Sequence, residues 1–455
     1  MKTDLLILRT GLIAATFTAL VPIALAATAD YSASATAAAP ASAGSAADAW
    51  GFGPPSWLTE ASVSLKEGYD TNVYGTGAIP LPGTPNIANV SSWFTVVSAR
   101  LSANLLPARL APEGFLTTLK LGYAADYTAY NSVAGEDNLR NSFMLLLKGK
   151  SGPWSVSIDN TFLYVAGPKA DPLYATYSPL GYAATRERRE QAQERNTSFV
   201  RYDGDTWFAR AVASALYYDL LENEHNPVGA YKGYINWVNR SDANTGIDFG
   251  YKLTPELALT AGWRLGAQTQ ELPAFGTTHN DSTYNRALLG VEGKLLPWLQ
   301  LQLVAGPDFR RYSDTPHLGL TGDRHTWLYT ESSLTATLSP RDSLVLSNLV
   351  WHFASTAGST SLQDTEDSFL YRHVFAKNLS ASAGVKIQGH RYDAPTVRND
   401  WATTIPLNLT YAFNRGLAAS LDYSWTRGRS VIPATLAPGR DWDERVVSLG
   451  LKLSF

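Results

Sequence analysis

The last ten residues of the chain, VVSLGLKLSF (446–455), alternate between apolar side chains and small or polar ones. The apolar face holds Val447, Leu449, Leu451, Leu453 and Phe455. A period of two is typical of a β-strand with one apolar face and one wet face. A half-buried strand of a soluble antiparallel sheet shows the same pattern, so the rest of the chain has to decide between a soluble and a membrane sheet.

The composition restricts a membrane assignment to one architecture. The chain has 455 residues, a formal net charge of −3, 13 Trp, 23 Tyr and no Cys. Beyond the N-terminus it lacks the run of about 20 apolar residues that a spanning helix needs. Only helices and closed barrels satisfy their backbone groups in lipid, so a membrane protein of this composition has to be a barrel. The lack of Cys excludes disulfides, thiolate metal sites and an N-terminal lipid anchor on cysteine, and the near-neutral charge gives no indication of nucleic-acid binding.

The N-terminus has the pattern of a secretory signal. Lys2 and Arg9 precede an apolar stretch that ends in Ala24-Leu25-Ala26, which fits a small-residue cleavage site. An Ala/Ser-rich tract without periodicity follows, and such a tract cannot bury enough surface to order itself. We therefore predict a signal peptide at 1–26, a disordered periplasmic tail at 27–58, and a barrel at 59–455.

From Glu60 onward the sequence repeats a simple unit of two alternating segments joined by a short polar turn and followed by a longer loop. Alternation is clearest in 115–127, 257–270, 298–305, 401–413 and 417–426. Turn residues cluster at Pro107–Gly114, Gly149–Pro153, Asp203–Asp205, Thr254–Glu256, Pro297, Pro340–Asp342, Lys377–Asn378 and Asn414–Gly416. These turns join pairs of strands, and single strands remain at 60–72 and 441–455, which predicts about 18 strands with both ends on the periplasmic side.

The length of the segments favours a membrane barrel over a soluble sandwich. Several segments alternate for ten or more residues, which matches the roughly 9–11 residues of a tilted spanning strand, whereas soluble strands usually have about six residues. Aromatic residues gather at segment ends (Trp93, Trp154, Trp298, Trp327, Trp401 and Trp425), as in the aromatic girdles of outer-membrane barrels. The predicted fold is an all-β, antiparallel, up-and-down transmembrane barrel in the outer membrane of a Gram-negative bacterium.

Three stretches resemble known outer-membrane barrels. The terminal Phe455 is similar to the last residue of their closing strand, which is part of the signal read by the barrel assembly machinery. Gly68–Tyr74, with Leu121-Gly122-Tyr123, and Arg195-Asn196 followed by Arg201–Asp205 resemble the β-barrel porin type 2 family over roughly residues 60–220. This resemblance implies an outer-membrane barrel and assigns no substrate. Asp70-Thr71-Asn72 could be read as a calcium site, but a turn is favoured because no further oxygen ligands follow at EF-hand spacing.

The alternation also indicates which charged side chains face the inside. The predicted pore-lining residues are Lys66, Arg100, Lys120, Asp126, Lys148, Arg264, Arg286, Glu292, Lys294, Arg372, Lys386 and Asp422. Basic residues outnumber acidic ones in this set, and charge of one sign sets pore selectivity. The sequence thus favours a porin-like channel for passive diffusion of small hydrophilic solutes with a mild anion preference. The alternative is that these charges pair across strands and leave no net field.

The longest loop, about Ala166 to Glu194, carries the constriction candidates Arg186, Arg188 and Arg189. Either it folds into the pore, or it extends the strands above the membrane. The scattered histidines and the absence of nucleophile, zinc-protease or phosphate-loop motifs predict that the protein is not an enzyme and has no cofactor or metal. A secretion or structural barrel that exports a polymer is the alternative function. Expected partners are lipid, lipopolysaccharide, the assembly machinery and small hydrophilic solutes, and the sequence leaves open whether copies associate.

Overall fold

The computed structural model describes residues 55, 57–75, 90–106, 114–167, 190–221, 238–271, 281–313, 323–354, 361–392, 398–431 and 441–455. These residues form a single 18-stranded antiparallel sheet that closes on itself. The predicted signal peptide, nearly all of the predicted tail, and Arg186, Arg188 and Arg189 lie outside the described residues. The described part contains no helix long and apolar enough to cross a membrane.

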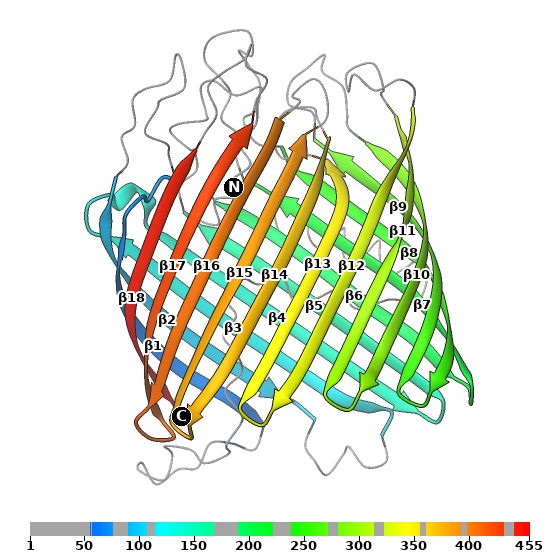
Figure 1. Cartoon of the computed structure of the whole chain (residues 1–455), viewed down its shortest axis with the longest axis horizontal. Helices are drawn as coiled ribbons and strands as arrows, with labels where there is room; N and C mark the ends of the chain where they lie inside the picture. The colour runs from blue at the N-terminus through cyan, green and yellow to red at the C-terminus, as the bar shows by residue number, and fades with distance from the viewer. Residues whose placement is uncertain are drawn as a thin grey trace, which may run out of the picture.

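The strands follow one another around the barrel in chain order (Figure 1). They are β1 (Leu58–Asp70), β2 (Ser92–Asn104), β3 (Leu116–Tyr130), β4 (Asn138–Ser151), β5 (Trp154–Ala166), β6 (Gln191–Asp203), β7 (Trp207–Asp219), β8 (Arg240–Thr254), β9 (Leu257–Gln270), β10 (Ser282–Leu296), β11 (Leu299–Tyr312), β12 (Arg324–Ser339), β13 (Asp342–Ala354), β14 (Ser361–Ala376), β15 (Leu379–Tyr392), β16 (Arg398–Ala412), β17 (Leu417–Val431) and β18 (Trp442–Ser454). A short 3-10 turn, η2 (Ala134–Glu136), links β3 to β4. The predicted strand number and the predicted antiparallel barrel are confirmed.

The barrel is closed by the strand from which the sequence argument began. β18 pairs with β1 from Ser62↔Ser454 to Asp70↔Val446, and the Phe455 backbone N–H donates to the Ala61 carbonyl at 2.9 Å. Closure gives every described strand a neighbour on both sides, as a barrel in lipid requires.

Short turns join the strands at the end of the barrel where the C-terminus lies, at the bottom of Figure 1. Gly152 illustrates the local chemistry, since it has φ +55° in the turn between β4 and β5, a conformation that favours glycine. At the opposite end, the Asp70 carboxylate accepts a hydrogen bond from the Asn72 N–H at 2.8 Å. This is the turn that the sequence favours at Asp70–Asn72.

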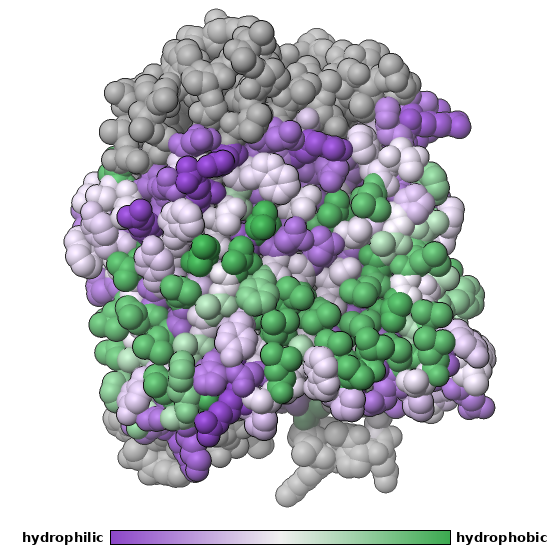
Figure 2. Space-filling view, in the orientation of Figure 1, coloured by the Kyte–Doolittle hydropathy of each residue, from purple (hydrophilic) through white to green (hydrophobic). Residues whose placement is uncertain are grey.

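The outer wall is apolar. Leu449 is 62% exposed and Leu289 is 71% exposed, and Figure 2 shows a band of hydrophobic residues across the visible strands, with hydrophilic residues above and below it. The aromatics Trp93, Trp154, Trp298 and Trp401 are exposed at strand ends, as predicted for girdles. Trp327 departs from that expectation, because its ring stacks on His352 of the neighbouring strand.

Candidate functional site in the charged interior

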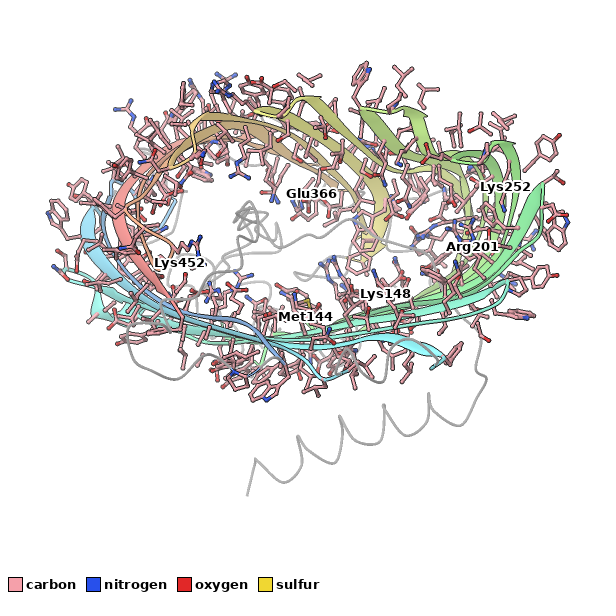
Figure 3. All side chains as sticks on the ribbon, turned by 90° about the horizontal axis from the view of Figure 1, so that it is seen from below. Met144, Lys148, Arg201, Lys252, Glu366 and Lys452 are labelled. Atoms are coloured by element: carbon pink, nitrogen blue, oxygen red, sulfur yellow. The ribbon has the colours of Figure 1, made fainter. Side chains whose placement is uncertain are left out.

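The inner face of the barrel can be identified directly. In Figure 3 the side chains of Met144, Lys148, Arg201, Glu366 and Lys452 lie on the enclosed side of the ring. Residues alternate between faces along a strand, and residues directly opposite each other on neighbouring strands share a face. The strand register therefore assigns a side to each described residue, and the enclosed face is rich in charged and amide side chains.

On the wall formed by β1–β3 and β16–β18, the predicted pore-lining charges form pairs between strands. The Lys66 ammonium lies 2.8 Å from the Asp422 carboxylate, which also accepts a hydrogen bond from Asn408 at 2.6 Å. The Arg100 guanidinium donates to both oxygens of Asp126, at 2.6 and 2.9 Å. Each pair combines one positive and one negative group, so the pairs add little net charge to the lumen.

A second group of inward residues is basic and has no ion-pair partner among the described residues. Lys120 on β3 and Lys148 on β4 are diagonal neighbours on the inner face. Thr118 is directly opposite Lys148, and Lys120 is directly opposite Leu146. Lys150 is the next inward residue of β4, and it lies opposite Ser155. The inward β5 residues beside these three lysines are Ser155, Ser157 and Asp159, of which Asp159 lies opposite Leu146. We call Lys120, Lys148 and Lys150 the lysine cluster.

The inner face of β6–β10 carries a connected charge network. Arg201 and Arg210 donate to the two oxygens of Glu292, at 3.0 and 2.9 Å. Arg210 also lies 2.9 Å from Asp248, and Asp248 lies 2.6 Å from Arg264. The network joins five consecutive strands, β6 to β10, and the bond from Arg201 to Glu292 links β6 to β10 across the three strands between them.

Nearer the other end of β10 and β11, two arginines share one carboxylate. Arg286 Nε and Arg310 Nη2 each donate to Asp308 Oδ2 at 2.9 Å, and the side chains of Arg310 and Asp308 are fully enclosed. Gln268 links this cluster to Asp242 on β8. Its Oε1 accepts from Arg310 at 2.5 Å and its Nε2 donates to Asp242 at 2.7 Å. The Arg286, Asp308 and Arg310 side chains are only 5%, 1% and 0% exposed, so this region is packed with side chains. The ion pairs among them offset part of the cost of burying their charges.

The end of β13 leaves the ring and explains this packing. Paired residues of β12 and β13 end at Thr330↔Val350, although β12 continues to Arg324 and β13 to Ala354. The last residues of β13 contact β9 on the far side of the lumen. Gln268 Nε2 donates to the His352 carbonyl at 3.1 Å, and Arg240 donates to the Ala354 carbonyl at 2.8 Å. In Figure 3 the ribbon of this part of the sheet turns inward from the ring.

The enclosed space is consequently divided into two parts. A lobe between β7 and β12 is filled by the charge networks and retains cavities of about 320 Å³ and about 60 Å³. The larger cavity is lined by Arg201, Arg210, Lys252 and Glu292, among others. The remaining space is bounded by β13–β18 and β1–β6, and it contains the lysine cluster.

The other predicted site residues are distributed as follows. Lys294 lies 2.6 Å from Glu256 in an exposed pair, and Lys386 lies 3.8 Å from Glu366. Arg372 is an inward residue of β14, opposite Ser343 and Ser382. Within the described residues there is no group of three or more His, Asp or Glu side chains arranged to hold a metal ion.

The predicted pore lining did not include Arg201, Arg210, Asp308 or Arg310, although these residues form the centre of the two networks. In β7 the inner face carries Phe208 and Val212 next to Arg210, and the outer face is alanine-rich, so the alternation is weak there. The strand register identifies Arg210 as an inward residue, because Arg210 lies directly opposite Arg201 on β6 and therefore shares its face.

No family model matches this sequence, and neither does any curated protein. Among solved structures, OccK2 (OpdF) of Pseudomonas aeruginosa is similar with 10% identity and a TM-score of 0.39, over 87% of this chain and 98% of that one. OccAB3 of Acinetobacter baumannii has 10% identity and a TM-score of 0.38, over 87% and 99% of the two chains. OpdK of Pseudomonas aeruginosa, solved with vanillate, has 11% identity and a TM-score of 0.41, over 87% and 98%. At this identity the likeness concerns the barrel fold alone. The closed sheet with an apolar outer belt is that of an outer-membrane protein.

Proposed function

We propose that the protein is a porin-like channel through which small hydrophilic solutes diffuse passively across the outer membrane. The observation that carries this proposal is the contrast between the two faces of one closed sheet, apolar outside and charged inside. An 18-stranded barrel is wide enough to enclose an aqueous channel. The path runs through the space bounded by β13–β18 and β1–β6, because side chains and the end of β13 fill the lobe on the other side.

A mild preference for anions follows from the lysine cluster. Most other inward charges of the described strands lie in ion pairs, and paired charges contribute little net field. Lys120, Lys148 and Lys150 add three positive charges to the wall of the path, and Asp159, the inward β5 residue opposite Leu146, balances only one of them. Unpaired charge of one sign on a pore wall favours counter-ions.

The remaining assignments complete the proposal. Residues 1–26 act as a signal peptide. Residues 27–58 form a periplasmic tail that leads into the barrel, whose first strand, β1, begins at Leu58. Phe455 contributes to recognition by the barrel assembly machinery, and the outer surface contacts lipid and lipopolysaccharide. Arg186, Arg188 and Arg189 narrow the path from the loop between β5 and β6. Membership of the porin type 2 family is part of the same proposal, as is the lack of enzymatic activity.

Conductance of the purified barrel in a planar bilayer tests the proposal. We expect discrete open levels in salt solution and, under a salt gradient, a reversal potential of the sign given by anion preference. Liposomes containing the protein should swell in small sugars. A barrel that inserts but neither conducts nor admits sugars would instead support the polymer-export alternative.

A further inference from the structure

The outer wall of β5–β7 carries a group of polar side chains within the apolar belt. Arg201 faces the enclosed space, so the alternate residues of β6, Glu194, Asn196 and Ser198, face outward. Asn160 of β5 lies directly opposite Asn196 and shares its face. Along β5, Asn160 is placed between the outward residues Ile158 and Phe162, so it lies inside the apolar belt.

Aromatic residues set the limits of the belt on this wall. On the periplasmic side, the Tyr202 ring contacts Trp154 and Trp207, with centroids 5.0 and 5.5 Å apart. On the other side, Tyr164 and Tyr217 are the outward residues near the ends of β5 and β7. Asn160 lies six residues from Trp154 and four from Tyr164 along β5, and Asn196 lies six residues from Tyr202 along β6. Both therefore lie within the belt, where hydrocarbon chains offer no hydrogen-bond partner.

The hydrogen bonds within this polar group do not use all of its donors and acceptors. Asn160 Nδ2 donates to Glu194 Oε1 at 3.1 Å, and Ser198 Oγ donates to Asn196 Oδ1 at 3.0 Å. Among the described residues, no partner is found for the Asn196 amide nitrogen or the Asn160 carbonyl oxygen. The group therefore offers both a donor and an acceptor to whatever lies against it.

The same wall is smooth and straight. The outward residues of β7 between its aromatic ends are Ala209, Ala211, Ala213 and Ala215, and Ala215 lies opposite Asn196. Figure 3 shows the cyan part of the ring, which includes β4 and β5, running nearly straight toward β7, whereas the opposite wall is curved. Small side chains on a straight wall allow another wall to approach closely, and polar side chains then form hydrogen bonds between the two.

A second outward polar group lies on β12–β14. Thr330 donates to Asn348 at 2.6 Å and Asn348 donates to Asp367 at 2.7 Å, so its members form one hydrogen-bonded chain across three strands. It lies at a similar distance from the periplasmic turns, since Asn348 on β13 and Asn160 on β5 are each the seventh residue of their strand. The β5–β7 group differs in lying beside the alanine wall of β7 and in having no partner among the described residues for the Asn196 amide nitrogen and the Asn160 carbonyl oxygen.

We propose that the outer wall of β5–β7 is the contact surface between two copies of this chain in the membrane. Lipid chains cannot bond to Asn160 and Asn196, and the polar part of lipopolysaccharide lies above the belt, beyond Tyr164 and Tyr217. Another barrel wall brings hydrogen-bonding groups to this depth. Because each Asn amide is both donor and acceptor, the surface is complementary to itself, as a contact between identical copies requires.

Cysteine cross-linking in native outer membranes tests this contact, since the chain has no Cys of its own. The single-thiol variants Asn160→Cys, Ser198→Cys and Ala213→Cys sample the surface. Ala383→Cys is the matched control, because Ala383 is an exposed outward residue of β15 at a similar distance from the periplasmic turns. Heat-modifiable migration on gels verifies that each variant has formed a barrel. We expect at least one of the three surface variants to give disulfide-linked dimers in several-fold excess over the control.

A large side chain introduced on the same wall provides a second test. Ala211→Trp should lower the mass of the wild-type oligomer in mild detergent to that of one chain, and Ala383→Trp should leave the oligomer intact. Dimers no more abundant in any of the three surface variants than in the control overturn the proposal, as does a wild-type barrel that has the mass of a single chain. Conductance is not part of either readout, so a failure here is distinct from a failure of the channel function.

Discussion

The indole ring of Trp327 on β12 lies flat against the imidazole of His352 on β13, with ring centroids 4.0 Å apart and planes 3° from parallel. The two strands have no paired residues beyond Thr330↔Val350, so at this height side chains rather than a backbone ladder join them. The stack closes the seam where the end of β13 turns into the barrel.

Removal of this stack should therefore loosen the partition between the two parts of the interior. Trp327→Ala deletes a contact worth about 0.5–1.5 kcal/mol beyond its buried area, and we expect larger or noisier single-channel currents in planar bilayers. Trp401→Ala is the control, because Trp401 is an exposed outward aromatic. Currents from Trp327→Ala that match those of the wild type would show that the seam has no part in limiting the path.

Asp308 should be the most sensitive carboxylate of the interior. Asp308→Asn keeps the size of the side chain but leaves Arg286 and Arg310 without their shared negative partner in a buried site. Breaking a buried pair in this way costs about 3–5 kcal/mol. Urea unfolding in lipid vesicles measures the loss of free energy of unfolding.

The matched comparison for Asp308 is Asp126→Asn, which breaks a pair with Arg100 whose side chains are 31% and 27% exposed. Partly exposed pairs contribute about 0–1 kcal/mol. Equal losses for the two variants would contradict the tight burial of the β10–β11 cluster.

The lysine cluster predicts the direction in which charge reversal should shift the ion selectivity. Lys120→Glu together with Lys148→Glu reverses two unpaired charges on the path, so the reversal potential in a salt gradient should shift toward cation preference. Lys377→Glu makes the same kind of charge change in a turn between β14 and β15, outside the barrel wall, and should leave the reversal potential near the wild-type value. A double variant that keeps the wild-type value would remove the cluster from the selectivity mechanism.

The strand order and the inner and outer faces follow from local sequence because lipid and water impose a period of two on each strand. The alternation of 257–270 predicts β9 (Leu257–Gln270) with no shift of either end, and the short turns fall where Pro, Gly, Asn and Asp cluster. Local patterns could not reveal that β13 leaves β12, since its partners on β8 and β9 are distant in sequence. The pairing of Arg201 and Arg210 with Glu292 is likewise a product of register across several strands.

Phe455 should matter for assembly beyond its contribution to the outer surface. Phe455→Ala should lower the amount of folded barrel in the outer membrane, because the aromatic end of the closing strand is the feature we assign to recognition by the assembly machinery. Phe413→Ala is the control, since Phe413 is also an outward-facing aromatic, is 57% exposed and lies beside a periplasmic turn. Quantitative immunoblots of outer-membrane fractions compare the two, and equal levels would mean that Phe455 acts only as surface.

The most general prediction concerns the solvent of the outer face. Leu449 lies in the middle of β18 and is 62% exposed, so lipid is its surroundings if the barrel spans the membrane. Leu449→Arg should then cost about 2–4 kcal/mol of unfolding free energy, as a charge near the bilayer midplane does. Ser424 on β17 lies opposite Val446 and faces the interior, so Ser424→Arg should be close to neutral because water solvates the new charge. Urea unfolding in vesicles ranks the two variants, and a larger loss for Ser424→Arg would reverse the assignment of faces on which the channel depends.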